Sequence, residues 1–581
     1  MDMEKAREMR STAHHLGVLL STAWFAGAVV ACGGSAPATQ ADGGPASKGG
    51  TIEPEASTAT ADGGSRKLDA SSPRLDASAG ADATSPGTDS SVPGADASSE
   101  GGASFDAPSD LAGTILAGHA IYSLVAGAPY TGRVVLRAKA AGATVQWKRG
   151  GTGCADAQSL TCLPASYAIE SASDSAHDWR CEVDTGALSP GNLVVRACDG
   201  EENPSVTVEV KARPATRTPF VPGVFLQQAV GDTSVGATEA SYLAGANLLV
   251  YWWQLQPTIG TFDDATLTLL PNWAHAIVLV KTGSEDVLPS PNPNSNRNGT
   301  PGWLVAAAPN AGLGRPLHTD NIGVGPYPWD PVYQDLSENM MAHVAAVLGG
   351  NPKLSAVYLA GATSHYNEMI LPGNADLTNV VAPVGLTAAE PVDSLDLTSC
   401  TEYIQAWERA IDSANSQFQA QIITPLDVVP ACSGGSYAAY DALKATAATP
   451  ISTATRAFGT VNLGYFTDAT GNTQQTTTFW NANAQFKDRM GPDSTLEYWE
   501  MGPKKMDPGP PSQAVMATRV TDILSAAAWG SQDTSGYFDA DAITMLESTW
   551  GYGTPVATAV CTLVQSYPYW WPNGTKPAAC P

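Results

Sequence analysis

Two glutamates in one short apolar run are the first candidates for a catalytic role. Glu497 and Glu500 lie in "STLEYWEMG", residues 494–502. A buried carboxylate is costly unless it is paired, hydrogen-bonded or protonated. One interpretation is that one glutamate faces solvent and the other forms a structural salt bridge. The alternative is that one of them is a catalytic group at the end of a strand.

A second candidate carboxylate, Glu368, follows another apolar run. The stretch "SAVYLAGATSHYNEMILP" passes from a strand-like segment into a loop that holds Asn367 and Glu368. Two carboxylates on different strands can face each other, one as a protonated acid and one as an ionised nucleophile, as glycoside hydrolysis requires. The competing interpretation is that Glu368 is a surface loop residue.

The strands and helices that would hold these carboxylates begin after Pro219, where strand-like runs alternate with helical ones. The expected strands are 222–228, 247–253, 276–282, 355–361, 420–426, 458–466, 494–501 and 536–542. Such alternation indicates parallel strands joined by crossover helices. It predicts an α/β fold, a (β/α)8 TIM barrel over residues 219–581, with its active site where the strands end.

The pattern resembles the clan A glycoside hydrolases, (β/α)8 enzymes that retain anomeric configuration, notably those of the β-galactosidase and cellulase type. "YWWQLQPTIGTFDD" (251–264) is similar to a stretch after strand two of those enzymes, and "TPGWL" (300–304) to a motif after strand three in some β-galactosidases. The resemblance covers residues 219–581.

By this resemblance Glu368 is the acid/base, Asn367 holds the substrate 2-hydroxyl and Glu500 is the nucleophile. Tyr465 matches a tyrosine often found beside the nucleophile. Glu497, on the same strand as Glu500, is the alternative nucleophile.

Aromatic side chains could line a sugar site. Trp253 follows the second strand, and Trp303 lies in a long loop after the third, a kind of loop that is usually functional. Core packing explains Trp253 equally well. His365 either lines the sugar site or is a solvated bystander.

Residues 111–213 contain short alternating runs separated by Gly, Pro and Ser. This pattern predicts a small antiparallel sandwich, immunoglobulin-like in architecture. No chemistry is evident there, so we interpret this region as a spacer or an accessory binding module.

The N-terminus has the features of an export signal. Residues 1–31 end in an apolar stretch shorter than the ~20 residues that span a bilayer, which is typical of a signal peptide. Small residues before Cys32 resemble the bacterial lipoprotein signal, in which that cysteine is lipidated. Residues 32–110, rich in Gly, Ala, Ser, Asp and Pro, are predicted to be a disordered tether. The alternative is an ordinary signal peptide with a cysteine nearby.

Charge and cysteine content narrow the functional class. The net charge of −26 argues against nucleic-acid binding, which needs a basic face. The eight cysteines after Cys32 predict disulfides in an exported chain. Cys400–Cys432 and Cys561–Cys580 are the natural local pairs, whereas the four cysteines within 154–198 allow three pairings. No C-x-x-C pair or His-rich cluster suggests a metal.

The sequence therefore predicts a monomeric, lipid-anchored glycoside hydrolase at the bacterial cell surface, or a secreted one. Its mechanism would be retaining, its substrate a β-linked carbohydrate, and no metal or organic cofactor is implied. A non-catalytic carbohydrate-binding surface lipoprotein is the alternative function. A barrel hydrolase with different chemistry has no supporting G-x-S-x-G or H-E-x-x-H run.

Overall fold

A computed structural model describes most of the chain after residue 120. The described residues are 121–139, 145–163, 178–198, 203–216, 218–229, 238–269, 273–283, 299–305, 317–319, 324–359, 401–425, 456–463, 466–467, 473–474, 495–500, 512–527, 541–545 and 547–581. The predicted signal segment, Cys32, the tether and the Cys400–Cys432 pair lie outside these residues.

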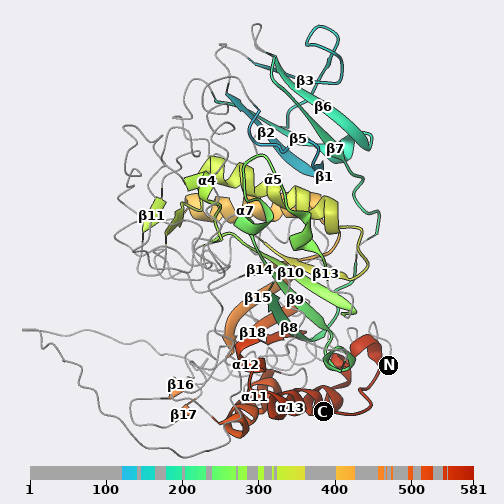
Figure 1. Cartoon of the computed structure of the whole chain (residues 1–581), viewed down its shortest axis with the longest axis vertical. Coiled ribbons are helices and arrows are strands. Elements are labelled where there is room, and N and C mark those ends of the chain that lie inside the picture. Colours follow the sequence, from blue (N-terminus) through green and yellow to red (C-terminus); the bar gives the residue numbers. More distant parts are fainter. Residues whose placement is uncertain are drawn as a thin grey trace, which may run out of the picture. The chain divides into compact units, whose positions relative to one another are not determined.

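Eight parallel strands form a closed barrel (Figure 1). In order around the barrel they are β8 (Gly223–Ala229), β9 (Gly245–Tyr251), β10 (His275–Lys281), β13 (Leu354–Tyr358), β14 (Gln421–Pro425), β15 (Arg456–Leu463), β18 (Thr495–Glu500) and β19 (Ala542–Met545). The α/β class and the parallel sheet are confirmed, and the first seven strands overlap their predicted ranges.

The predicted eighth strand, 536–542, shares only its last residue with β19, and residues 536–540 lie outside the described residues. The chain bends at Asp541 and β19 runs from Ala542 to Met545. The four residues of β19 are all buried, and strands covered on both faces read as continuous apolar runs.

One apolar cluster occupies the inside of the barrel. It combines alternate residues of neighbouring strands, including Phe225, Leu249, Ile277, Leu279, Ala356, Tyr358, Ile423 and Ala542. The opposite faces of the strands pack with the helices in a larger cluster. The period-2 geometry of strands thus separates an inward from an outward face.

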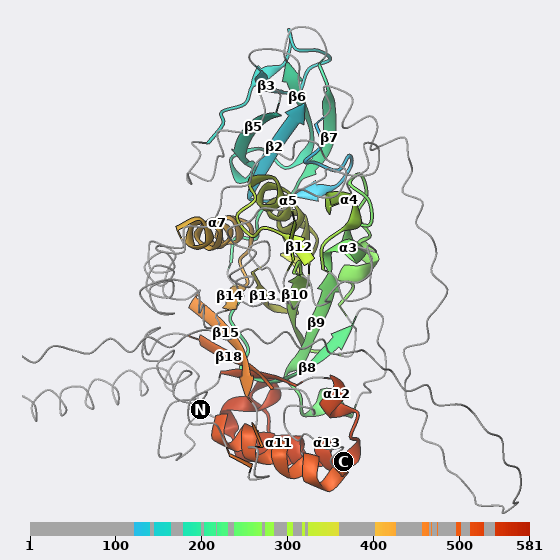
Figure 2. The ribbon, with the colours of Figure 1, turned by 90° about the vertical axis from the view of Figure 1, so that its left-hand side faces the viewer.

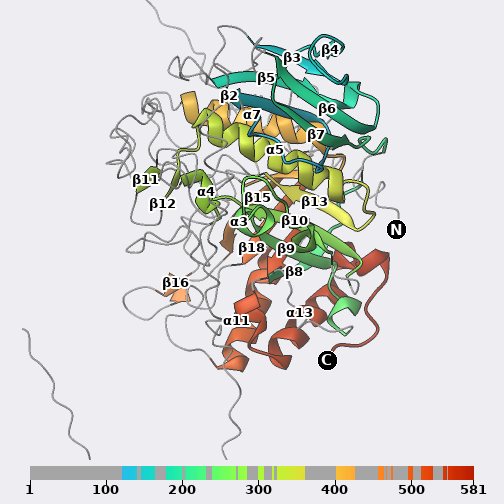
Figure 3. The ribbon, with the colours of Figure 1, turned by 45° about the horizontal axis from the view of Figure 1, so that its top comes forward.

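Four long helices follow strands in the described residues: α5 (Pro331–Leu348), α7 (Thr401–Gln417), α11 (Gln513–Ala527) and α13 (Thr554–Ser566). α5 begins where the Asp330 carboxylate accepts hydrogen bonds from the N–H groups of Val332 and Tyr333, with Pro331 in the first turn. α11 and α13 lie side by side (Figure 2), as do α5 and α7 (Figure 3).

The remaining elements are short. The helical ones are η2 (Thr185–Ala187), η3 (Glu239–Ser241), α3 (Trp252–Leu255), η4 (Asp264–Leu267), α4 (Gly302–Val305), α12 (Glu547–Trp550), η6 (Pro568–Trp570) and η7 (Pro572–Gly574). Two small antiparallel pairs join β11 (Leu317–Thr319) to β12 (Val324–Pro326) and β16 (Phe466–Thr467) to β17 (Thr473–Gln474).

The C-terminal segment closes the end of the barrel at which the strands begin. Trp570 is fully buried, and the Tyr569 hydroxyl donates a hydrogen bond to Asp541, just before β19. Asn573 Oδ1 lies 3.1 Å from the ring nitrogen Nε2 of His275, the first residue of β10. The opposite end, where the strands finish, is the mouth of the barrel.

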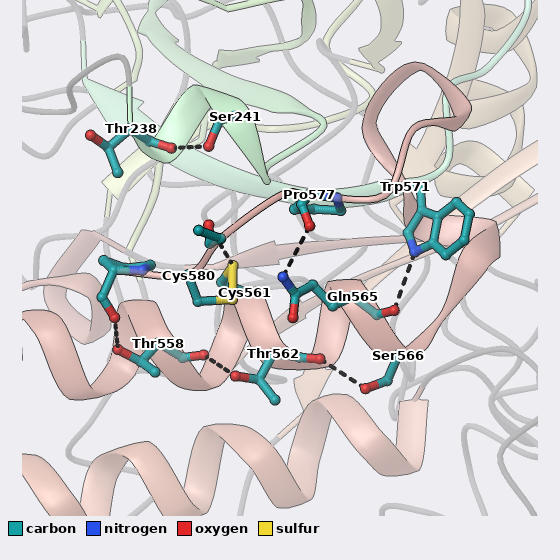
Figure 4. Close-up of a disulfide and its surroundings, with 12 residues drawn as sticks. Thr238, Ser241, Thr558, Cys561, Thr562, Gln565, Ser566, Trp571, Pro577 and Cys580 are labelled. Carbon is teal, nitrogen blue, oxygen red and sulfur yellow. Dashed lines mark hydrogen bonds between the residues drawn. A yellow bond between two sulfur atoms is a disulfide. The ribbon is translucent and has the colours of Figure 1, made fainter.

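A disulfide between Cys561 and Cys580 ties the C-terminal tail to α13 (Figure 4), which confirms that predicted pair. Gln565 Nε2 donates to the Pro577 carbonyl at 3.0 Å, and Thr558 Oγ1 donates to the Pro581 carbonyl at 2.8 Å. The tail is therefore held along the length of α13.

In the described residues seven strands precede the barrel, and we call them the N-terminal strands. They are β1 (Pro129–Tyr130), β2 (Arg133–Lys139), β3 (Gln146–Arg149), β4 (Gln158–Ser159), β5 (Asp178–Asp184), β6 (Gly191–Cys198) and β7 (Ser205–Val210). They form a five-stranded sheet, β1-β7-β6-β3-β4, and a separate β2–β5 pair, bridged internally by the disulfides Cys154–Cys198 and Cys162–Cys181. The β1–β7 pairing is parallel, where the sequence predicts antiparallel strands throughout.

Buried polar groups of helix α5 form hydrogen bonds and ion pairs with the N-terminal strands. Asn339 Oδ1 accepts from the Val135 N–H at 2.7 Å, and its Nδ2 donates to the Ser123 and Val135 carbonyls. Asp335, also on α5, is fully buried among arginines of β2, β5 and α7. Through these contacts the N-terminal strands pack against the barrel helices α5 and α7.

Candidate active site

Glu500 is the last residue of β18, the seventh barrel strand in chain order, so it lies at the mouth of the barrel. Barrels of this kind keep their catalytic groups at that end. Glu368, Asn367, His365 and Tyr465 lie outside the described residues. Their predicted roles remain predictions.

The pairing of β18 distinguishes its two glutamates. Glu497 is paired with Gly459 of β15 and Ala542 of β19, and Ala542 belongs to the cluster inside the barrel. Glu497 therefore occupies an inward register position within the strand. Glu500 is paired with Leu463 after an irregularity in the β15 register, at the rim. Both glutamates stay candidates for the nucleophile, one deeper and one at the mouth.

A buried lysine at the mouth was not predicted from the sequence. Lys281 ends β10, pairs with Tyr251 at the end of β9, and is 2% exposed. Its ammonium lies 5.5 Å from the centre of the Tyr251 ring, within cation–π range. Its spacing in the sequence could have indicated this burial, because Lys281 follows Ile277 and Leu279 at every second position, on the same face of the strand.

Trp253 lies beside this pair. Its ring centre is 6.4 Å from that of Tyr251, tilted by 38°, and the side chain is only partly buried. Its backbone N–H donates to the Gly299 carbonyl at 3.2 Å. Stacking on a sugar remains the predicted role of Trp253.

Trp303 has a more enclosed environment. The side chain is 7% exposed, and its indole N–H donates to the Gln256 carbonyl at 2.9 Å. It packs edge-to-face on Trp252 at 6.1 Å, in the cluster between strands and helices. Its described contacts are those of a core residue, and sugar stacking by Trp303 stays a prediction.

The loop after β9 is anchored by a histidine of α5. The Phe262 ring stacks on His343 at 3.8 Å with an interplanar angle of 7°, and His343 Nε2 lies 2.7 Å from Asp264 Oδ1. The other ring nitrogen, Nδ1, is 3.0 Å from the Pro129 carbonyl of β1. The hydrogen bond with His343 lowers the pKa of the Asp264 carboxyl, outweighing partial burial. The residues "FDD" thus hold this loop in place.

No group of three or more His, Cys, Asp or Glu side chains in the described part of the chain could hold a metal ion. No helix among those residues is both long and apolar enough to cross a membrane.

Comparisons with known proteins give weak resemblances. No family model matches the chain, and no curated protein matches it. Among solved structures, endo-glycoceramidase II from Rhodococcus sp., as a lactosyl-enzyme intermediate, is 14% identical with a TM-score of 0.34, covering 58% of this chain and 76% of that one. An endogalactoceramidase is 12% identical with a TM-score of 0.30, covering 57% and 71%. A Prevotella bryantii endo-beta-mannanase/endo-beta-glucanase is 10% identical with a TM-score of 0.34, covering 59% and 48%. Similarities this low are no basis for assigning an activity to this chain.

Proposed function

We propose that this chain is a retaining glycoside hydrolase that cleaves a β-linked glycoside or polysaccharide. The observation that carries the proposal is the placement of Glu500 at the mouth of a closed barrel of eight parallel strands, as the last residue of the seventh strand. In the proposed enzyme the barrel is a complete (β/α)8 unit. The N-terminal strands form an immunoglobulin-like sandwich packed on it.

The proposed reaction is a double displacement. The Glu500 carboxylate attacks the anomeric carbon while the Glu368 carboxyl gives its proton to the departing glycosidic oxygen. Glu368, now ionised, then takes a proton from water, whose oxygen attacks the same carbon and releases Glu500. Such a pair requires carboxyl groups about 5–5.5 Å apart.

The remaining predicted residues would bind the sugar. Asn367 would hold the 2-hydroxyl, Tyr465 would lie beside the nucleophile, and Trp253, Trp303 and His365 would contact the rings. The partly buried Trp253 beside Tyr251 is the described feature that supports a binding surface at the mouth.

The proposed location is the bacterial surface, with a lipid on Cys32 and the globular part carried on the tether. The three described disulfides support export, because disulfides persist mainly in oxidising compartments. The proposed protein works as a monomer without metal or cofactor.

The test is hydrolysis of a panel of activated aryl β-glycosides by the full chain. Glu368→Ala should reduce turnover most for substrates with poor leaving groups, because these need the proton in the transition state. Glu500→Gly should abolish turnover. Glu209→Gln, on β7 and paired with exposed Lys211, is the matched control and should leave rates unchanged. Glycan binding without turnover, unaffected by either site variant, would favour the non-catalytic binding protein instead.

A further inference from the structure

Gln227 faces the inside of the barrel from its first strand, β8. Phe225, two residues earlier, belongs to the inner apolar cluster, and successive side chains of a strand alternate between its two faces. The next residue, Gln228, agrees with this register, because its Oε1 accepts a hydrogen bond from the Trp273 indole in the cluster between strands and helices. Gln227 stands two residues before the end of β8, on the side of the mouth.

The amide of Gln227 is open to solvent inside the barrel. Its side chain is partly exposed, whereas that of Gln228 on the outer face is fully buried. The C-terminal segment covers the end where the strands begin, so solvent reaches the inner face of β8 from the mouth. In the described part of the chain no group is hydrogen-bonded to the Gln227 amide, which can both donate and accept.

A second amide, that of Asn247, lies beside Gln227 on the neighbouring strand. The two residues are paired in the register of β8 with β9. Asn247 is fully buried, and its Nδ2 donates to Thr544 Oγ1 on β19 at 3.1 Å. Because β9 and β19 flank β8, this hydrogen bond crosses the inner face of β8. The Asn247 carbonyl oxygen, Oδ1, is buried with no partner among the described residues, and such an acceptor is costly to leave unpaired.

These groups suit a neutral ligand rich in hydroxyl groups. A sugar hydroxyl both donates and accepts, as an amide does. Binding sites combine apolar walls with a few placed polar groups, and the next inward residues of β9, Leu249 and Tyr251, supply such walls. β8 is separated from β18, the strand of Glu497 and Glu500, by β19 alone. Since neighbouring strands are about 4.8 Å apart, β8 and β18 lie about 10 Å apart along the barrel wall.

We propose that Gln227 is a specificity-determining residue that holds a hydroxyl group of the sugar unit whose anomeric carbon is attacked. The proposal rests on the proposed function and adds to it a contact that the clan A resemblance does not supply. The unpartnered oxygen of Asn247 is a second acceptor beside it for the same ligand. A site that hydrogen-bonds a substrate hydroxyl rejects an analogue that does not present it there, because a polar group is then left unpaired.

The experiment measures binding and turnover separately. Aryl 1-thio-β-glycosides of glucose, galactose, mannose and xylose, whose sulfur-linked bond resists hydrolysis, are the binding probes in calorimetric titration, and the corresponding oxygen glycosides are the substrates. The full chain is compared with Gln227→Met, which keeps the length of the side chain and removes both hydrogen-bonding groups, and with Gln227→Leu. Gln513→Met, at an exposed position at the start of α11, is the matched control. Thermal unfolding checks that each variant is folded.

Gln227→Met should fold as stably as the wild type and bind the preferred thioglycoside roughly 3- to 10-fold more weakly, the net effect of one neutral hydrogen bond. The ratio of kcat/KM between the preferred sugar and its epimers should fall by a similar factor, whereas Gln513→Met should change neither quantity.

The possible failures are distinguishable. Unchanged affinity and unchanged discrimination in folded Gln227→Met or Gln227→Leu would overturn this proposal and leave the proposed function in place. Binding that depends on Gln227, without turnover of any glycoside, would refute the hydrolase and support the sugar contact. A wild-type chain that binds none of the probes would overturn both.

Discussion

Replacing Asp335 by asparagine should loosen the N-terminal strands from the barrel. The Asp335 carboxylate is fully buried and lies 2.9 Å from Arg180 Nε and 2.6 Å from Arg137 Nε, with Arg409 also in contact. Burial alone would raise the pKa of Asp335, but the charges of the three arginines outweigh it, and the pKa lies well below its usual value. The carboxylate therefore stays ionised in the folded protein at all ordinary pH values.

The expected loss follows from this arrangement. Removing one partner of a buried ion pair costs about 3–5 kcal/mol, because uncompensated charge is left behind. The substitution Asp335→Asn would leave the buried guanidinium groups of Arg137 and Arg409, and the partly buried one of Arg180, without this counter-charge, so we expect a loss within or above that range. Because the folded pKa of Asp335 is depressed, the stabilisation is present above its unfolded pKa of about 3.9 and is lost as the pH falls below that value.

Hydrogen exchange at pH 7, read by mass spectrometry on peptides from β2, β5 and α5, measures this loss locally. Lys211→Met is the control, because it breaks an exposed pair worth about 0–1 kcal/mol. Protection of those peptides in Asp335→Asn should fall by at least two orders of magnitude relative to the control, since about 1.4 kcal/mol corresponds to a factor of ten. Equal protection in the two variants would show that the buried network does not hold the two parts together.

Four further outcomes are expected. Asp264→Asn should weaken hydrogen-exchange protection of the loop after β9 at pH values above the unfolded pKa of Asp264. At lower pH it should have no effect, because the hydrogen bond with His343 is then lost in the wild type as well. A loss of protection that does not depend on pH would contradict this. Cys561→Ser removes a disulfide that spans 19 residues and should lower the free energy of unfolding by about 3 kcal/mol. An unchanged thermal unfolding curve would show that this disulfide does not stabilise the fold. Trp570→Ala removes a fully buried indole at the closed end and should cost about 3–5 kcal/mol, which unaltered unfolding would refute. Cys32→Ser should release the protein from membranes, and a wild-type chain without an N-terminal acyl mass would end the lipoprotein hypothesis.

The barrel strands were predictable because their burial on both faces makes them apolar runs of the right length. The last strand, β19, shares only Ala542 with its predicted range, because "AITM" is only four residues long. Such a short run carries little periodic signal. Its place is set by pairing with β18 and β8, which the sequence does not display.

The burial of polar residues on α5 was not predictable for a different reason. Gln334, Asp335, Glu338 and Asn339 would ordinarily mark the solvent face of α5, yet all are buried. They are covered by the N-terminal strands and α7, whose arginines and backbone groups satisfy them. Sequence periodicity shows that a face is polar, but it cannot show that another part of the chain covers that face.

The same limit applies at the mouth. Lys281 ends an apolar run and reads as the point where a strand reaches solvent, although it is buried over Tyr251. Glu500 was predicted to lie at a strand end, and it does. The choice between Glu497 and Glu500 depends on register, and a shift of one residue exchanges the two faces of a strand.

Azide rescue of Glu500→Gly on an activated aryl β-glycoside tests whether Glu500 is the nucleophile of a retaining hydrolase. Azide would attack the anomeric carbon in place of the missing carboxylate, expel the aryl oxide and leave an α-glycosyl azide, the product of a single inversion. We predict that Glu500→Gly loses turnover and regains it with azide, while Glu497→Gly needs no azide to turn over. Loss and rescue at Glu497 instead would move the nucleophile to the deeper position, and a wild-type chain that hydrolyses none of the glycosides would contradict the proposed function.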